Sequence, residues 1–488
     1  MPYPSGINIT VNKWAKAIPL DPKEKVDPPF DNDPTKVLIP RPFTTNPAHT
    51  KDISRILLGD NERLLATSLQ IGFDHLRTPI GTIPPCLPEF KDWYVRVASQ
   101  KMDAWRYLGI DMAIKTSLYP YHIRPVFLTA LMHFWNPNVN CFCLPRGMIG
   151  PNLLDSAMIA RLPVTWRDPA AVSIQVKTEV SYKAKSWIGF INHNKGNGDD
   201  VSDTEHTAFL VYWMSHYILW PKNKKPSSRI QVLAYWLALG NRAAIGTLFL
   251  AELFNGINQY ITAVRTSTVT ETTITGPLWF LEAWARYYFN LGVVGYLEFP
   301  REIVLTTPPA VTIMRATSHD DSLSNLFEAI LSDGRLDRDF FIYENSMQIA
   351  GYPLWGNPAA EPPRLGANRL AGDLSAWDSI LCPRYLFASQ TLENNKLKVR
   401  PEIYMPHCLA RQLGCCQAFP DPLPSELVPD SDGLGFLLPK DAFSLARIMD
   451  FSIFSRTQTP FKLTACSLTN VDVWWATMWR SLCHSTED

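Results

Sequence analysis

The sequence has no net charge. Its 488 residues include 46 Lys and Arg and 46 Asp and Glu, and charged residues make up 19%, below the roughly 25% usual for soluble domains. This balance excludes a global field that would draw the protein to nucleic acid or anionic lipid, although it is compatible with a local basic patch. Hydrophobic residues at 46% and aromatics at 12%, with 16 Trp, favour a well-packed globule over a disordered chain.

The chain also lacks the cysteine density of a disulfide scaffold and the start of a secretory signal. Nine Cys is an odd number, and they are scattered, which indicates a reducing compartment. The first ten residues, MPYPSGINIT, contain no basic segment followed by an apolar run. We therefore expect no secretory signal.

Familiar catalytic motifs are missing. The sequence has no G-x-x-x-x-G-K-[ST] phosphate loop, no G-x-G-x-x-G after a strand, no H-E-x-x-H and no G-x-S-x-G elbow. These absences lower the odds of an enzyme without excluding one, and no catalytic residue is predicted from a motif.

Three weaker groups of residues were weighed as metal sites. Two combine the thiols and imidazoles that zinc prefers: His133, Cys141 and Cys143, and then His407, Cys408, Cys415 and Cys416. Neither has paired C-x₂-C spacing, so buried packing of small apolar side chains is the better interpretation. The third, Asp320, Asp321, Asp333, Asp337 and Asp339, has the ligand type of a magnesium site but is better explained as an acidic helix start and a polar turn. No metal or cofactor site is predicted.

The stretch Arg229 to Phe254 is apolar enough to suggest a membrane span. Arg242 would then lie near the bilayer centre, which costs about 2.5–3.5 kcal/mol. Two buried helices explain the pattern better, Ile230 to Leu239 and Ala243 to Phe254, with Gly240 as the C-cap of the first and Gly256 ending the second. The stretch is therefore predicted to be the centre of a core.

Helical patterns dominate the rest of the chain. Residues 1–55 are rich in Pro, Asp, Lys and Thr and are predicted to be an extended arm, residues 56–480 one large, mainly α composite domain, and residues 481–488 a tail. The best-marked helix starts are a capping box at Ser202 and Glu205 and a first-turn Pro277. Strand signals are few, the clearest being 171–180 and 296–305.

Two further segments have competing interpretations. Lys222 to Lys225 (KNKK) is either a nuclear-import patch or a solvated loop, and the loop needs no partner. Trp474, Trp475 and Trp479 near the end of the chain are either a partner surface or a terminal helix docked on the core. Docking is the simpler explanation for these tryptophans.

Four ordered segments together resemble the plant mobile domain, a family also labelled aminotransferase-like and found in plant transposons. They are AFLVYWMSHYIL with the following VLAYWLALGNRAAIGTLFLAELFNGI, then GPLWFLEAWARYYF, VRPEIYMPHCLARQLGCCQAFPDPLP and LMHFWNPNVNCFCLPRGMIGPNLLDSAMIARLPV. The family-motif residues carried by these segments are Trp135, Gly147, Asp155, Trp279, Trp284, Tyr404, Arg411, Gln412 and Gln417. Met148 stands where many members have an acidic residue, so that carboxylate has no counterpart here.

The resemblance implies a nuclear protein related to members that maintain meristems and silence transposons. It implies a protein partner, either a phosphatase-like protein or a chromatin factor, and is compatible with nucleic acid binding. It implies no established reaction. A pyridoxal-phosphate enzyme needs a Schiff-base Lys, a ring-nitrogen partner and a phosphate cup, and no Gly/Ser-rich turn beside a suitable Lys is visible. The favoured hypothesis is a non-catalytic interaction module, and the alternative is an aminotransferase-like enzyme or a metal-dependent nuclease using Asp320–Asp339.

Overall fold

The structure is a computed structural model that describes most of the chain outside the segment 290–378. The described residues are 10–11, 14–18, 36–59, 86–119, 123, 125–184, 186–221, 225–265, 275–289, 379–389, 391–393, 396–423, 437–450, 457–458, 461–462, 466–468 and 470–483. In them the fold is mainly α with a few short strands, as predicted. The proposed domain boundaries at 55 and 480 stay a prediction.

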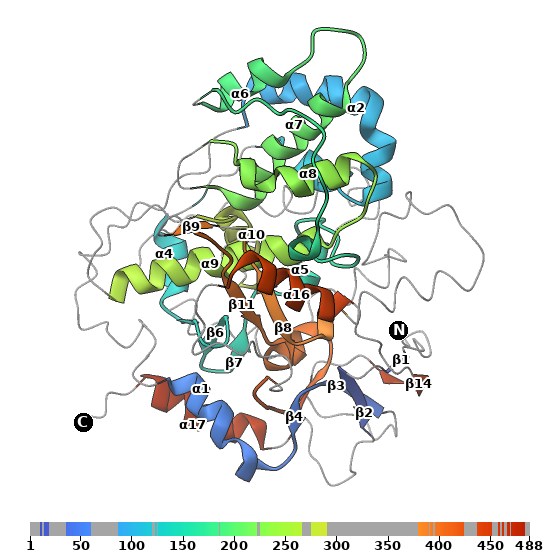
Figure 1. Cartoon of the computed structure of the whole chain (residues 1–488). Helices are drawn as coiled ribbons and strands as arrows, with labels where there is room; N and C mark the ends of the chain where they lie inside the picture. The colour runs from blue at the N-terminus through green and yellow to red at the C-terminus, as the bar shows by residue number, and fades with distance from the viewer. Residues whose placement is uncertain are drawn as a thin grey trace, which may run out of the picture.

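A helical layer forms the upper part of the molecule in Figure 1. It contains α2 (Pro88–Leu108), α6 (Trp187–Asn194), α7 (Asp203–Met214) and α8 (Gln231–Ala238), with α3 (Asp111–Thr116) following α2. Ser202 caps α7 by accepting a hydrogen bond from the backbone N–H of Glu205 at 3.1 Å, as predicted. Gly109 ends α2 in the left-handed region at φ 74°. We call this the upper helical layer.

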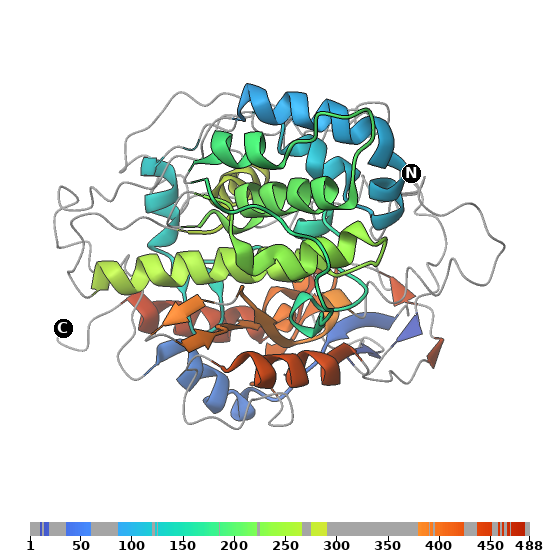
Figure 2. The same ribbon diagram turned by 45° about the horizontal axis from the view of Figure 1, so that its top comes forward.

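Helix α9 (Ile245–Arg265) crosses the middle of the molecule, which Figure 2 shows along its length. It packs with α10 (Leu278–Tyr288) and α5 (Leu153–Met158), and α4 (Pro125–Met132) packs against α10, while the π-helical turn η5 (Ser215–Leu219) extends α7 towards α9. The ring of Phe249 lies 5.8 Å from that of Trp279 and 4.9 Å from that of Phe280. The apolar stretch is therefore the centre of a protein core. Among the described residues, no helix is long and apolar enough to span a membrane.

Two sequence predictions about local structure were wrong. Gly240 does follow the end of α8 at φ 82°, but Gly256 lies inside α9 and does not end it. Burial of Ile257 and Tyr260 on the continuing helix outweighs the roughly 1 kcal/mol helix penalty of a glycine.

Residues 171–180 form no strand. Ala171 ends the short helix η4 (Pro169–Ala171). The side chains that follow alternate in exposure as in a strand, but this segment pairs with no other strand in the described part of the chain. The predicted strand at 296–305 lies outside the described residues.

Short strands lie below α9. An antiparallel sheet of three strands contains β5 (Trp135–Asn136), β6 (Cys141–Leu144) and β7 (Gly147–Ile149). A second antiparallel pair, β8 (Arg384–Phe387) with β11 (Pro401–Tyr404), places Glu402 opposite Leu386 beside α9. The hairpin of β9 (Thr391–Glu393) and β10 (Lys396–Lys398) lies between β8 and β11 in the sequence. These strands connect α9 to the C-terminal third of the chain.

Strands from the proline-rich arm pair with strands from the last third of the chain. The pairs are β1 (Thr10–Val11) with β14 (Thr457–Gln458), β3 (Lys36–Pro40) with β15 (Phe461–Lys462), and β4 (Phe43–Thr44) with β13 (Phe419–Pro420). Strand β2 (Ala15–Ile18) completes the sheet on β3, and β12 (Cys416–Gln417) pairs with β16 (Cys466–Ser467). The two ends of the sequence thus share one structural region.

The C-terminal helix α17 (Val471–Cys483) packs against α1 (Lys51–Leu58) at the bottom of Figure 1. The indole N–H of Trp475 donates to the carbonyl oxygen of Leu144 at 2.8 Å, and the ring of Trp479 stacks on Phe134. Docking of the tryptophan-rich helix is confirmed. The remaining elements are η1 (Pro47–His49), η6 (Ser228–Ile230), η8 (Pro406–Leu413) and α16 (Pro439–Asp450).

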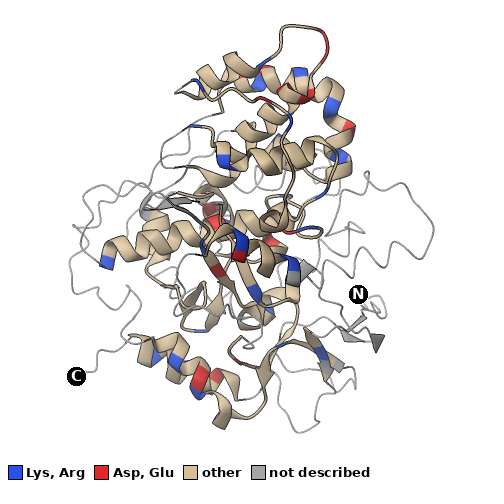
Figure 3. Ribbon diagram, viewed as in Figure 1, with Lys and Arg blue, Asp and Glu red and all other residues tan. Residues whose placement is uncertain are grey.

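Charges of both signs are distributed over the described helices. In Figure 3, both blue and red residues occur on α2, α1 and α17, whereas α9 is uncharged over most of its length. This distribution matches the zero net charge of the sequence.

Candidate functional site

Asp155 is the centre of a hydrogen-bonded cluster that joins α5 to α10. Its backbone N–H and carboxylate exchange hydrogen bonds with Asn152 in a capping box, at 3.1 and 3.0 Å. The carboxylate also accepts from the indole N–H of Trp284 at 3.1 Å and from the hydroxyl of Tyr288 at 3.0 Å. Because Asp155 is fully buried, these bonds fix α10 against the start of α5.

The other residues of the fourth and third motif segments bind one another across the β5–β7 sheet. Arg411 donates to the carbonyl oxygen of Arg146 at 2.7 Å. Its guanidinium occupies the space that a side chain at Gly147 would need, and Gly147 itself has φ 143°. The side-chain oxygen of Gln412 accepts from the backbone N–H of Gly150 at 2.8 Å. This contact attaches η8 to the end of β7.

The three remaining aromatic motif residues are bonded in the same way. Tyr404 donates through its hydroxyl to the carbonyl oxygen of Ile380 at 2.7 Å. Trp135 donates to the side-chain oxygen of Asn258 on α9 at 2.8 Å, and Trp279 donates to the carbonyl oxygen of Tyr217 at 3.2 Å. Each indole or hydroxyl therefore connects its own element to a different one.

Gln417 completes the set. Its side chain accepts from the backbone N–H of Ala410 at 3.2 Å and donates to the carbonyl oxygens of His407 and Ala418. Except for the half-buried Arg411, all nine family-motif residues are buried. The structure therefore brings the motif segments together, and their buried hydrogen bonds join helices, strands and η8.

The two Cys and His groups are not arranged as metal sites. Among the described residues, no group of three or more His, Cys, Asp and Glu side chains has positions suited to holding a metal ion. His133 bonds through Nδ1 to the carbonyl oxygen of Thr129 in its own helix, and His407 bonds through Nε2 to that of Asp421. Burial raises the pKa of the Cys415 thiol and lowers the pKa of His407 to about 4. The side chains of both groups are buried in the core.

The acidic group Asp320–Asp339 lies outside the described residues, as do Lys222, Asn223 and Lys224 of the basic loop. Their roles stay as predicted from the sequence.

Sequence reasoning missed a pair of buried carboxylates between α9 and β11. Glu402 accepts from the side-chain amides of Asn258 at 2.8 Å and Asn140 at 3.3 Å, and its other oxygen lies 3.0 Å from Nε of Arg400. Glu252 accepts from the backbone N–H of Ser389. We call Glu252 and Glu402 the carboxylate pair.

Burial raises the pKa of both members of the carboxylate pair to about 7. The charge of Glu252 further raises the pKa of Glu402, whereas Arg400 and the two amides lower it. A pKa near neutral suits general acid or base chemistry, but both side chains are inside the packing, at 4% and 3% exposure. A signal was present in the sequence, since Glu252, Asn255 and Asn258 recur every three residues in an otherwise apolar helix.

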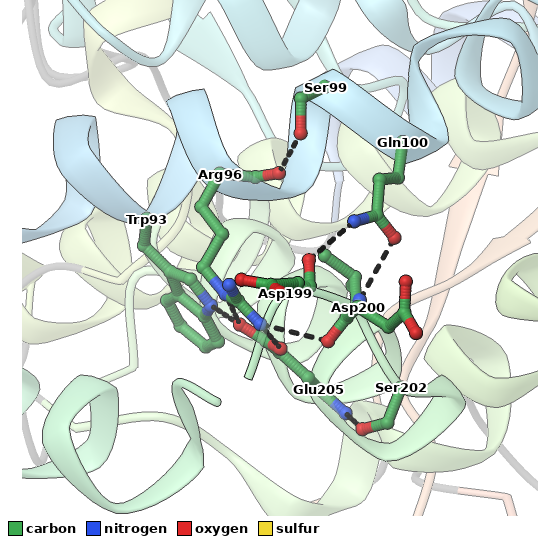
Figure 4. Close-up of polar contacts among 9 residues, drawn as sticks. Trp93, Arg96, Ser99, Gln100, Asp199, Asp200, Ser202 and Glu205 are labelled. Carbon is green, nitrogen blue, oxygen red and sulfur yellow. Dashed lines mark hydrogen bonds and ion pairs between the residues drawn. The ribbon is translucent and has the colours of Figure 1, made fainter. Parts of the chain in front are cut away.

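A second buried glutamate, Glu205, lies in the upper helical layer (Figure 4). Its carboxylate binds Arg96 through two nitrogen atoms, at 2.9 and 3.1 Å, and accepts from the indole N–H of Trp93 at 3.0 Å. Burial by itself would raise the pKa of Glu205, but the hydrogen bonds from Arg96, Gly196 and Trp93 together hold it below its usual value. Of the predicted capping box, the Ser202 half is confirmed, but the Glu205 half is wrong: the Glu205 carboxylate binds Trp93 and Arg96 on α2 instead of the Ser202 N–H.

The same cluster holds the loop before α7 against α2. Figure 4 shows the side chain of Gln100 donating to the carbonyl oxygen of Asp199, while Arg96 donates to that of Asp200 at 2.9 Å. Next to Glu205, His206 accepts from the indole N–H of Trp105 at 2.9 Å, and burial lowers its pKa to about 3. These contacts fix the crossing of α2 and α7.

Comparison with known proteins agrees with the motif segments. No curated protein and no solved structure matches this chain. The family model described as plant mobile domain matches residues 109–432, and all four motif segments fall within that range. Because the match covers more than half of the sequence, the chain belongs to the plant mobile domain family.

Proposed function

We propose that this protein is a non-catalytic interaction module that acts in the nucleus, in transposon silencing and the control of gene expression that maintains meristems. Its partner would be a phosphatase-like protein or a chromatin factor, and a transposon origin is part of the proposal. The observation that supports it is the position of the family-motif residues. Eight of the nine are buried, and their hydrogen bonds join structural elements.

The location of these residues bears on the kind of function. An active site places its reacting groups where a substrate can reach them, in a concave pocket with polar groups converging on it. Here Asp155, Tyr404 and Gln412 are buried and point to backbone or indole groups of the same chain. If the family-motif residues stabilise the fold in this way, recognition of a partner is left to residues on the surface.

The test is affinity purification of the tagged full chain from plant nuclei with mass spectrometry, beside a tag-only control. We expect reproducible enrichment of a phosphatase-like or chromatin protein. The purified recombinant chain is examined in parallel by absorbance and metal analysis. A pyridoxal-like absorbance band, a stoichiometric metal ion, or failure to enrich any nuclear partner over the control would overturn the proposal.

A further inference from the structure

Two aromatic side chains are exposed in the described part of the chain, and they flank the same arginine. Tyr107 at the end of α2 and Trp166 in the loop before η4 are each 50% exposed. The guanidinium carbon of Arg242 lies 4.1 Å from the ring centroid of Tyr107 and 4.4 Å from that of Trp166. Exposed Leu239 lies three residues before Arg242. Most aromatic residues here are buried, so this arrangement is unlike the rest of the described surface.

The backbone holds this arrangement in place. Trp166 has φ 83°, in the left-handed region that bulky side chains rarely adopt, and such positions cluster at functional sites. The next residue, Arg167, accepts at its carbonyl oxygen from the N–H of Ala244 at 2.8 Å. Arg242 donates through Nε to the carbonyl oxygen of Tyr107 at 3.0 Å. This hydrogen bond joins the end of α2 to the turn between α8 and α9.

The charge of this surface is mainly positive. Arg167 is exposed, with its guanidinium 5.4 Å from the ring centroid of Trp236, and Arg242 lies between the two exposed rings. On the adjacent end of α2, Arg106 pairs with Asp103 at 3.0 Å. Aromatic faces beside arginines favour a partner with flat π-systems and negative charge.

We propose that the aromatic–arginine surface, consisting of Tyr107, Trp166, Arg167 and Arg242, binds single-stranded nucleic acid. Bases stack on the exposed aromatic faces, and the arginines pair with phosphates. This inference goes beyond the proposed function, because it names one surface and a nucleic-acid partner in addition to the proposed protein partner. A duplex keeps its bases stacked inside, so it cannot use the aromatic faces. A stable protein interface has an apolar centre depleted of charged residues, whereas here an arginine lies between the two exposed rings.

The experiment measures binding of the full chain to fluorescein-labelled 20-nucleotide single-stranded DNA, the same sequence as RNA, and the corresponding duplex. Trp166→Gly is the main variant, because glycine adopts φ 83° without strain and should preserve the fold. We expect it to weaken single-strand binding about tenfold or more. Arg167→Ala should weaken binding and reduce the slope of log K against log salt by about one.

Two matched variants serve as controls. Arg447→Ala on α16 removes another exposed arginine that lies over an aromatic ring, 5.7 Å from Phe443, and Val473→Ala removes an exposed apolar side chain on α17. Both should bind like the parent chain. Circular dichroism and thermal unfolding check that every variant is folded.

The outcomes separate this inference from the proposed function. Absence of single-strand binding at 50 mM salt, binding that Trp166→Gly leaves unchanged, or preference for the duplex would each overturn the inference. If Trp166→Gly instead loses an enriched nuclear protein while oligonucleotides do not bind, the surface recognises a protein, so the inference fails and the interaction module stands. If neither oligonucleotides nor nuclear proteins bind, both proposals fail.

Discussion

The side chains of Glu205 in the upper helical layer and Glu402 beside α9 are both almost inaccessible to solvent, yet the pKa of Glu205 is lowered and that of Glu402, which lies deeper in the protein, is raised. Glu205 faces a guanidinium through two contacts and an indole N–H. Glu402 faces two neutral amides, one arginine contact and the second carboxylate of Glu252. Burial alone does not decide whether a glutamate is charged, because the partners that replace water decide it.

The largest effect is expected from Glu205→Ala. Removing the carboxylate leaves the buried indole N–H of Trp93 without an acceptor and leaves Arg96 bound only to the carbonyl oxygen of Asp200, so the free energy of unfolding should fall by about 3 kcal/mol at pH 7. Urea unfolding measures it. The matched control is Asp203→Ala on the same helix, where the carboxylate is 74% exposed and 3.9 Å from Lys101, and the loss should be at most about 1 kcal/mol. Equal losses for the two variants would contradict the comparison.

Glu402→Gln should increase the free energy of unfolding above neutral pH, whereas Glu205→Ala decreases it. The pKa of Glu402 is raised to about 7, so its contribution is fully present below the unfolded-state value near 4.5 and is lost as pH rises towards 7. The variant has no such charge to bury. It should exceed the unfolding free energy of the parent by at most about 1 kcal/mol at pH 5 and by about 3 kcal/mol at pH 8.

Urea unfolding from pH 5 to pH 8 tests this expectation. Glu252→Gln is the companion variant, because it removes the like charge that raises the pKa of Glu402. A Glu402→Gln protein less stable than the parent at pH 8 would show that the carboxylate is charged and well compensated.

His206→Gln should have a smaller effect, on how the free energy of unfolding falls below pH 7. Burial lowers the pKa of His206 to about 3, so its stabilising contribution is present above the unfolded-state value near 6.5 and is lost as pH falls below it. Between pH 7 and pH 5.5 the parent should lose about 1 kcal/mol that the variant keeps, since a glutamine oxygen can still accept from Trp105. His193→Gln, at an exposed position on α6, is the control. Parallel pH profiles for the parent and His206→Gln would refute the assignment.

Local signals predicted much of the fold, and long-range contacts explain what they missed. Ser202 and Pro277 mark helix starts because capping and proline geometry act within one turn. Gly256 was misassigned because tertiary burial of Ile257 outweighs a local preference. Residues 171–180 alternate like a strand but have no ladder partner, and only the fold decides pairing.

The candidate site shows the same limit. The family resemblance selected Asp155, Trp284 and Gln412 by residue, but the bond between Asp155 and Trp284 joins positions 129 residues apart. The bond between Gly150 and Gln412 spans 262 residues. The carboxylate pair was missed because the three-residue recurrence that begins at Glu252 marks a polar face of α9 but does not show which residue meets it, and Glu402 approaches only through the pairing of β8 with β11.

The pairing of β3 with β15 also has a consequence for synthesis on the ribosome. The partner of Lys36 is Phe461, so the edge of β3 emerges roughly 400 residues, or about 20–80 s at 5–20 residues per second, before the strand that covers it. Unpaired strand edges are templates for aggregation. This edge of β3 therefore stays without its native partner for most of translation, and a premature stop before 457 leaves β1 and β3 without β14 and β15.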